Sequence, residues 1–412
     1  MQETSRHAVG IDIGTTTVRC VVAHIDGTSG LPTIVGVGVA ANSGMRKGNV
    51  VNLAGPSQAI DDALGEAERM SGYQVDNATI SINGSHILST HADGMIAVSG
   101  VGHEIIEEDL VRVEEVATIG KVPANREILE VIPHSYRLDG QDGIKNPIGM
   151  TGTRLEIDAH VVSVLTPHIA NLQKATEDAK VTPRSIIVAG VAAARAVLSE
   201  KQLENGVALI DIGGATTNIA IYEEGDLQFT AVVPIGGANI TNDLAIGLKT
   251  DPEIAEKLKV EHASAVTRHD ASGVSLKYEN EIYNFNTSDI DEIVEARLEE
   301  LFELINKELK RAGRLGKLPN GAVLTGGTAN LKGIVEYAKE ALGLAVRVGE
   351  ISDYGGVADD IRQPQFATAI GLMLIDSENN SYSNQKSGHQ KGGRAPKNIG
   401  GIFSGFFGRF KI

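Results

Sequence analysis

The sequence Gly10-Ile11-Asp12-Ile13-Gly14-Thr15-Thr16-Thr17-Val18 lies near the start of the chain, and its design recurs far downstream as Leu209-Ile210-Asp211-Ile212-Gly213-Gly214-Ala215-Thr216-Thr217-Asn218-Ile219. Each stretch has an apolar run with an Asp, a Gly turn beside hydroxyl side chains, and a second alternating strand. This pattern predicts two β-hairpins. Two copies so far apart indicate two related lobes with a cleft between them.

The residue types in both turns suit a phosphate and its metal. Glycine lets a ligand approach the main chain, and turn N–H groups with Thr hydroxyls can point at an anion. An Asp would repel a bare phosphate, so we expect Asp12 and Asp211 to organise a hydrated Mg²⁺ through water. The pair therefore predicts a nucleoside triphosphate site. Two structural turns, each with a satisfied Asp, are the alternative, because a Gly-rich turn after a strand is a weak signal.

Composition limits the class of protein. A chain of 412 residues is expected to form two to three domains. The net charge of −16 argues against general nucleic-acid binding. Cys20 is the single cysteine, which excludes a disulfide framework and a Cys-based metal site. We find neither a signal-peptide pattern nor an apolar run of about 20 residues, so we expect a cytosolic protein.

The pattern changes from about residue 84, where a small α+β insert is expected. It would have two short strands in 85–101, an acidic amphipathic helix at 104–119, and strands at 128–136 and 153–164. The next helix should begin with Thr166 as its cap and Pro167 at its first position.

The end of the chain changes composition again. Residues 377–397 are polar and read as a disordered linker. Apolar side chains then recur at helical spacing beside basic ones; this set is Ile399, Ile402, Phe403, Phe406, Phe407, Arg409, Phe410 and Lys411. Such a segment would lie in a membrane interface with its basic residues near anionic lipid. Docking on the protein's own core or on a partner is the alternative.

The two hairpins resemble the phosphate-binding hairpins of the actin, Hsp70 and sugar-kinase superfamily. The strand that ends at Thr325-Gly326-Gly327-Thr328 resembles the element that leaves room for adenosine there. Within that superfamily the first-lobe insert, the segment Val131-Ile132-Pro133-His134-Ser135-Tyr136 and the segment Pro234-Ile235-Gly236-Gly237-Ala238-Asn239 are similar to the FtsA family of bacterial division proteins. The resemblance covers residues 8–375.

The resemblance implies an α/β fold, namely a two-lobed actin-like (ribonuclease-H-like) ATPase fold with the insert in the first lobe and a C-terminal amphipathic helix. The implied boundaries are 1–84 and 164–195 for the first-lobe core, 85–163 for the insert, 196–239 and 313–376 for the second-lobe core, 240–312 for its outer subdomain, 377–397 for the linker and 398–412 for the membrane helix.

The resemblance also implies the nucleotide contacts. They are Asp12, Gly14, Thr15, Thr16, Thr17, Asp211, Gly213, Gly214, Thr216, Thr217, Asn218, Gly236, Gly237, Glu256, Lys259, Gly326, Gly327 and Thr328. Glu256 and Lys259 have the i, i+3 spacing that holds ribose and adenine in the superfamily, although a surface ion pair is the alternative.

Three residues depart from the superfamily pattern. Thr17 stands where FtsA proteins often have Lys, and Arg19 on the same face could substitute. Asn218 stands where Asp is frequent. Ala189 falls where Hsp70-like ATPases have the Glu that orients water, so we predict tight ATP binding with slow hydrolysis.

By resemblance, the function is an ATP- and Mg²⁺-binding adaptor at the cytoplasmic face of the cell membrane. It would tether FtsZ polymers through the FtsZ C-terminal peptide, form filaments with itself and recruit later division proteins, without binding nucleic acid. A PilM-like pilus-assembly adaptor and a sugar-kinase-like enzyme are the alternatives. A kinase would have no use for the apolar tail, and an Hsp70-like chaperone would need a peptide-binding domain after the ATPase.

Overall fold

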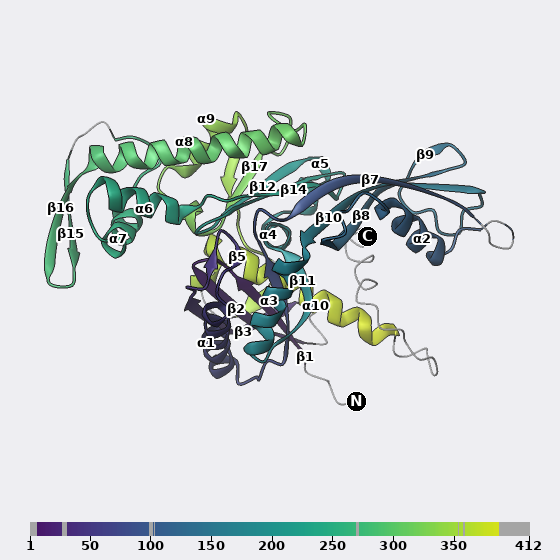
Figure 1. Cartoon of the computed structure of the whole chain (residues 1–412), viewed down its shortest axis with the longest axis horizontal. Coiled ribbons are helices and arrows are strands. Elements are labelled where there is room, and N and C mark those ends of the chain that lie inside the picture. Colours follow the sequence, from purple (N-terminus) through teal and green to yellow (C-terminus); the bar gives the residue numbers. More distant parts are fainter. Residues whose placement is uncertain are drawn as a thin grey trace.

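Two central sheets organise the structure, a computed structural model that describes residues 6–26, 31–98, 102, 104–268, 272–352, 354–356 and 359–386 (Figure 1). Buried hydrophobic residues form three clusters. The first fills the first lobe and extends onto the face of the second-lobe sheet that carries Leu209, Ala220 and Tyr222, and the other two lie in the second lobe and in the insert. The expected arrangement of two lobes with a small α+β insert in the first is confirmed.

The first-lobe sheet has the strand order β11-β6-β1-β2-β3-β19. Its strands are β1 (Arg6–Ile13), β2 (Thr17–Ile25), β3 (Pro32–Ala41), β6 (Asn77–Ile82), β11 (Thr182–Val188) and β19 (Gly355–Gly356). Strands β1 to β3 form an antiparallel meander, whereas β6 and β11 join β1 in parallel. The lobe's helices are α1 (Ala54–Ser71), α3 (Thr166–Asp178), α4 (Ala189–Val197) and α10 (Ala367–Lys386), and a two-residue hairpin, β4 (Met45–Arg46) with β5 (Asn49–Val50), lies in the expected loop.

The second-lobe sheet repeats this topology with the order β14-β13-β12-β17-β18. Its strands are β12 (Val207–Ile212), β13 (Thr217–Glu223), β14 (Asp226–Val233), β17 (Ala322–Thr325) and β18 (Val346–Val348). Again an antiparallel meander is followed by two parallel strands. The helices are α5 (Glu200–Asn205), α6 (Gly237–Gly247), α7 (Pro252–His262), α8 (Thr287–Arg311) and α9 (Ile334–Leu342). Two copies of one topology explain the two copies of the hairpin motif.

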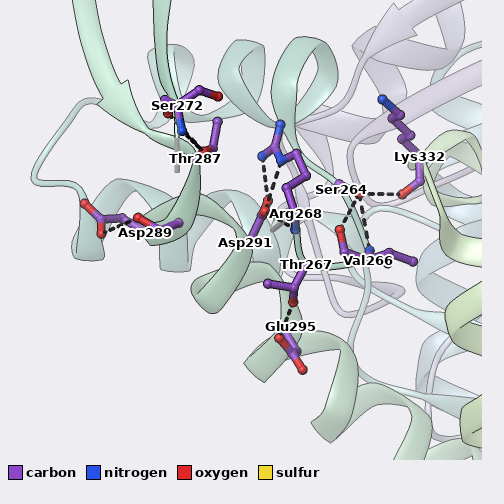
Figure 2. A network of polar contacts seen from close by, with 11 residues as sticks. Ser264, Val266, Thr267, Arg268, Ser272, Thr287, Asp289, Asp291, Glu295 and Lys332 are labelled. Carbon is purple, nitrogen blue, oxygen red and sulfur yellow. Dashed lines mark hydrogen bonds and ion pairs between the residues drawn. The ribbon is translucent and has the colours of Figure 1, made fainter. Parts of the chain in front are cut away.

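The outer part of the second lobe is a hairpin, β15 (Gly273–Tyr278) and β16 (Glu281–Asn286), held beside α7 and α8. Figure 2 shows the polar network that fixes the preceding loop to α8. Asp291 is 1% exposed and accepts hydrogen bonds from the Arg268 backbone N–H (2.9 Å) and guanidinium Nε (3.0 Å). Thr267 donates to Glu295 one turn further along the helix (2.6 Å). This network orders a loop that has little apolar surface of its own.

The insert is a four-stranded antiparallel sheet, β7-β10-β8-β9, with helix α2 (Glu107–Thr118) on one face. Its strands are β7 (Leu88–Ala97), β8 (Arg126–Leu138), β9 (Gln141–Ile144) and β10 (Arg154–Leu165). The expectation of two short strands in 85–101 is wrong, because β7 pairs with β10 without interruption. Gly94 is not a turn residue; a Cβ there would lie 2.7 Å from the Ala117 backbone nitrogen of α2.

Two helix ends also differ from the expectation. Helix α3 begins at Thr166 itself, with Leu165 as its cap residue and no side-chain capping bond, so Thr166 is not the cap. Helix α10 continues to Lys386, so residues 377–386 are helical rather than part of a disordered linker. At the start of this extension Glu378 pairs with Arg195 of α4 (2.6 Å), and the preceding Asp376 pairs with Arg184 (2.6 Å). The rest of the linker and the expected membrane helix at 398–412 lie outside the described residues.

Helix α10 crosses the first-lobe sheet at β1, where the two backbones are in contact. A Cβ on Gly10 would lie 2.3 Å from the Ala369 carbonyl oxygen, and one on Gly371 would lie 1.7 Å from the Ala192 carbonyl oxygen of α4. Glycine is therefore required at both positions by close approach. Within the described part of the chain, we find no helix that is long and apolar enough to cross a membrane.

Candidate functional site

The first hairpin places its Asp at the end of β1, before a turn over Gly14–Thr17. The Gly14 N–H donates to the Thr17 carbonyl (3.1 Å) and closes the turn. Ser81, at the end of β6, donates to Asp12 Oδ1 (2.9 Å) while accepting from the Ile13 N–H (2.8 Å). In this register Asp12 lies opposite Arg19 on β2. Ligand sites in such sheets gather at these strand ends.

The second hairpin is a geometric copy of the first. The Gly213 N–H donates to the Thr216 carbonyl (2.9 Å), and Asp211 lies opposite Asn218 on β13. Asn218 Nδ2 donates to Asp211 Oδ2 (2.9 Å). Asn218 is therefore the counterpart of Arg19 in the first hairpin, and each Asp has one polar cross-strand neighbour.

The two turns face each other across the lobes at short range. A Cβ on Gly214 would lie 2.5 Å from Thr16 Oγ1, so the second turn can approach the first only because residue 214 is glycine. Asn83, just beyond β6, donates from Nδ2 to Thr216 Oγ1 (3.0 Å). Any group inserted between the turns must move the lobes apart. The facing arrangement predicted from the two motifs is thus what the structure has.

Charge is concentrated between the turns. Burial raises the pKa of Asp12, whereas the Arg19 charge and the Ser81 hydrogen bond act in the opposite direction. Burial and then the nearby Asp12 carboxylate raise the pKa of Asp211 to about 7. The Arg19 guanidinium interacts with both carboxylates and lies over the Phe366 ring, 5.6 Å from its centroid. Arg19 thus partly offsets the repulsion between the two acids.

Two buried polar atoms at the site can still form a hydrogen bond with a ligand. Among the described residues, Arg19 Nε and Asn218 Oδ1 are buried without a hydrogen-bond partner. Leaving such atoms unpaired costs about 1–3 kcal/mol each, which indicates that a polar ligand completes the site. No group of three or more His, Cys, Asp or Glu side chains within the described ranges is placed to hold a metal directly. Mg²⁺ held here through water by Asp12 and Asp211 fits that donor set.

Two more segments of the second lobe lie against the second turn: the start of α6 and the turn at 326–328. The Gly237 N–H, at the start of α6, donates to the Gly213 carbonyl (2.9 Å), and Thr328 Oγ1 donates to the same oxygen (3.2 Å). A Cβ on Gly237 would lie 2.4 Å from Thr328 Oγ1. Gly326 has φ +85°, and a Cβ there would lie 2.4 Å from Asp211 Oδ1. Close packing around the turn therefore requires both residues to be glycine.

Glu256 and Lys259 form the ion pair that their spacing predicts, with Nζ 2.6 Å from Oε2. Lys259 Nζ also donates to Thr241 Oγ1 (2.9 Å) and to the Gly237 carbonyl (3.2 Å), so Lys259 lies against α6 while Glu256 remains exposed to solvent. The ion pair and a nucleotide contact are compatible, and the nucleotide role of Glu256 and Lys259 stays a prediction.

Some predicted residues have other partners. Thr217 is fully buried and donates to the Ile235 carbonyl (2.8 Å), so its hydroxyl points into the second lobe and is not a phosphate ligand. Thr15 Oγ1 accepts from the Gly48 N–H (2.9 Å), which ties the first turn to the β4–β5 loop. Gly236 abuts the backbone of the second turn, whereas a Cβ on Gly327 would be in ordinary van der Waals contact with Gln365 (3.9 Å).

Sequence reasoning missed Ser81, Asn83 and Thr241. Ser81 and Asn83 close β6, a parallel strand beside β1, and the rule that ligands meet the carboxyl ends of such strands could have found them. Thr241 joins Glu256 and Lys259 in one hydrogen-bonded group, but its place on α6 becomes visible only in the fold.

Two lobes of one topology, with facing hairpins at their junction, define an actin-like protein. Solved structures of that class resemble the chain: the PilM-PilN type IV pilus biogenesis complex (TM-score 0.66, 16% identity, 90% of this chain and 98% of that chain) and MreB5 of Spiroplasma citri bound to ADP (TM-score 0.54, 13% identity, 92% and 98%).

Sequence comparison narrows the class to one family. The profile of cell division protein FtsA matches residues 208–371, and that of the SHS2 domain inserted in FtsA matches residues 84–163. Cell division protein FtsA of Pseudomonas aeruginosa is 34% identical over 401 residues (96% of this chain, 95% of that protein), and that of Bacillus subtilis is 35% identical over 384 residues (92% and 86%). The chain belongs to the FtsA family of cell-division proteins.

Proposed function

We propose that the chain is an ATP-binding, actin-like adaptor that tethers FtsZ polymers to the cytoplasmic membrane, forms filaments and recruits later division proteins. The observation that carries the nucleotide part is the pair of facing hairpins, with the buried Asp211 carboxylate, the half-buried Asp12 carboxylate and the Arg19 guanidinium between them. Family membership and the apolar, basic end of the sequence support the tethering part.

Each residue has a role set by its chemistry. The hydroxyls of the turns over Gly14–Thr16 and Gly213–Thr216, and their N–H groups other than those of Gly14 and Gly213 that close the turns, bind phosphate oxygens, and Arg19 supplies a cation beside them. Asp12 and Asp211 orient water around Mg²⁺, which neutralises phosphate charge when bound. Glu256 and Lys259 hold the nucleoside end, with Lys259 bonded to the Gly237 carbonyl at the start of α6.

Slow hydrolysis follows from what lies at the start of α4. Ala189 is 2% exposed and stands in a run of small apolar residues, 189–194. Its side chain cannot orient an attacking water. We therefore propose that ATP acts mainly as a structural or switching ligand, with at most slow turnover.

Equilibrium binding of a fluorescent ATP analogue tests the nucleotide part. The full chain should bind it in the presence of Mg²⁺ and bind it more weakly when EDTA removes the metal. The double variant Asp12→Asn, Asp211→Asn should lose the Mg²⁺ dependence, because amides hold metal-bound water poorly. Equal binding by the full chain with and without Mg²⁺ would contradict the proposed metal role, and no binding at all would refute the nucleotide site.

A PilM-like adaptor is the second candidate, favoured by the structural likeness to the PilM-PilN complex. The two assignments differ in partner. An FtsZ C-terminal peptide should bind this chain, whereas a peptide from the N-terminus of a pilus-assembly subunit should not; the reverse result would favour the pilus role.

A further inference from the structure

The insert belongs to the first lobe by chain connection but also contacts the second lobe. It leaves the first lobe after β6 and returns through β10 directly into α3. Strands β7, β8 and β10 all lie against β14, the edge strand of the second-lobe sheet, and Figure 1 shows these strands beside one another. A part of one lobe therefore covers the sheet edge of the other.

Three polar contacts form what we call the insert–β14 contact. Lys145, after β9, lies 2.9 Å from Asp226 Oδ2 and 3.6 Å from Glu224 Oε2. His134 Nε2 donates to the Leu227 carbonyl (3.0 Å). The Thr230 N–H donates to Ser89 Oγ (3.0 Å). Two of these bonds satisfy backbone groups on the outer edge of β14, so the insert replaces the neighbouring strand that β14 lacks there.

The junction between insert and first lobe is stiff enough to transmit movement. Arg126 bridges the two ends of the insert, with Nε 3.0 Å from Ser163 Oγ, Nη2 2.8 Å from the Ser163 carbonyl and a further bond to the His86 carbonyl. The rings of His86 and His168 stack with centroids 4.3 Å apart, which joins the start of the insert to α3. The insert therefore moves with the first lobe.

The lobes are joined at several places beside the facing turns. The chain crosses between them from α4 to β12 and again after β18, and α4 packs on β12 and β13. The insert–β14 contact is a further junction, and it lies on a part of the first lobe that is inserted far from these crossings in sequence. A nucleotide that enters or leaves between the turns must part the lobes, because Thr16 and Gly214 are in contact. A stiff insert cannot follow both lobes, so this movement strains or breaks the insert–β14 contact.

We infer that the insert–β14 contact holds the cleft closed and limits the rate at which nucleotide exchanges, so that the position of the insert reports the nucleotide state. The inference rests on the proposed nucleotide site. It gives the insert an intramolecular role, and any ligand that draws the insert away from β14 would accelerate exchange.

Charge reversal at Lys145 tests the inference. Lys145→Glu places a third carboxylate beside Asp226 and Glu224, and Lys145→Glu with Asp226→Lys restores one attractive pair. The matched control is Lys121→Glu, which breaks the 2.9 Å pair of Lys121 with Asp93 inside the insert and touches no part of β14. All variants are made in the full chain.

The first readout is the release rate of a pre-bound fluorescent ATP analogue chased with excess ATP. Lys145→Glu should release it about three- to fivefold faster, the effect of losing one ion pair, while the double variant and the Lys121→Glu control stay near the wild-type rate. An unchanged rate in Lys145→Glu, or equal acceleration in the control, would overturn the inference.

The second readout needs no nucleotide. Hydrogen–deuterium exchange of the β14 amides should speed up in Lys145→Glu and not in Lys121→Glu, because the Thr230 N–H loses its acceptor when the insert moves away. If the wild-type chain binds no analogue, the proposed nucleotide-binding function is refuted, and the inferred control of nucleotide release by the insert is refuted with it. If the wild-type chain binds the analogue but hydrogen–deuterium exchange of the β14 amides is the same in Lys145→Glu as in wild type, only the inference fails.

Discussion

Arg19 is the residue on which the charge balance of the site depends. It interacts with Asp12 and Asp211, and its Nε is among the buried polar atoms of the described chain that lack a partner. A guanidinium can bind a phosphate and a carboxylate at once, which a neutral side chain cannot do. The two carboxylates without it would repel each other and the phosphates.

The prediction is that Arg19→Ala weakens binding of a fluorescent ATP analogue by about tenfold or more, as expected for loss of a charge-assisted hydrogen bond. Arg19→Lys should recover part of the affinity, since it keeps the charge without the planar fork. Fluorescence titration in Mg²⁺ measures both. If Arg19→Ala binds the analogue with wild-type affinity, Arg19 does not contact phosphate and only offsets the repulsion between the Asp12 and Asp211 carboxylates.

His86 makes stability depend on pH. Burial, then the nearby His168 charge, lowers the pKa of His86 to about 4, and its Nδ1 is one of the buried atoms that have no partner within the described residues. The His86 imidazole takes up a proton near pH 6.5 in the unfolded chain but only near pH 4 in the folded chain. Stability therefore falls as pH drops through that window.

The free energy of unfolding should fall between pH 7 and pH 4, and we predict that His86→Gln makes this fall smaller by about 3 kcal/mol, since one pKa unit corresponds to about 1.4 kcal/mol. Urea unfolding of both proteins at the two pH values measures the difference. His160, whose pKa burial lowers to about 3, leaves a residual pH dependence in the variant. An equal loss in the two proteins would contradict the assignment to His86.

Helix α10 is the element that joins the first-lobe sheet to α4. It packs on both with backbone contact at Gly10 and Gly371, and Asp376 accepts hydrogen bonds from the Val9 N–H (3.0 Å) and from Thr79 (2.8 Å). Such contacts cannot accommodate an added methyl group without moving a helix.

The expected result is that Gly371→Ala lowers the free energy of unfolding by about 1–3 kcal/mol, because its Cβ would meet the Ala192 carbonyl oxygen at 1.7 Å. Gly65→Ala in α1 is the matched control. A Cβ there meets no atom of the described chain within 4 Å, so the substitution should stabilise the protein by about 0.5–1 kcal/mol. Thermal unfolding of both variants measures the two changes in stability. Equal changes in Gly371→Ala and Gly65→Ala would contradict the argument that α10 packs against the α4 backbone at Gly371.

The elements predictable from sequence are those set by local pattern. The two hairpins and the insert follow apolar periodicity and glycine turns, and the structure confirms them. Strand β7 was split wrongly because Asp93-Gly94 has the composition of a turn, while Gly94 actually makes room for α2. Helix α10 continues beyond the expected boundary at residue 376. The polar composition from Ser377 onward favours a linker, but the distant Arg195 pairs with Glu378.

Site geometry was less predictable because it depends on register and on contacts between lobes. The four-residue first turn places Arg19, not Thr17, opposite Asp12, and strand alternation turns the Thr217 hydroxyl into the core. The contact of Asn83 with Thr216 and that of Lys145 with Asp226 join residues far apart in sequence. Local pattern carries no information on such pairs.

The assembled protein has two lobes with the proposed nucleotide site between them, an insert that contacts both lobes, and a terminal sequence with apolar and basic residues. An adaptor needs these parts together: the folded lobes for a polymer partner and the terminal segment for the lipid. Neither part alone would bring FtsZ to a membrane, so the proposed function can be tested by removing one of them.

Co-sedimentation of FtsZ with anionic vesicles makes that test. FtsZ polymers are mixed with vesicles, ATP, Mg²⁺ and either the full chain or a chain that ends before Asn398. The account predicts that FtsZ pellets with vesicles only when the full chain is present. FtsZ that remains in the supernatant with both chains, or pellets equally with both, would contradict the proposed role as a membrane tether.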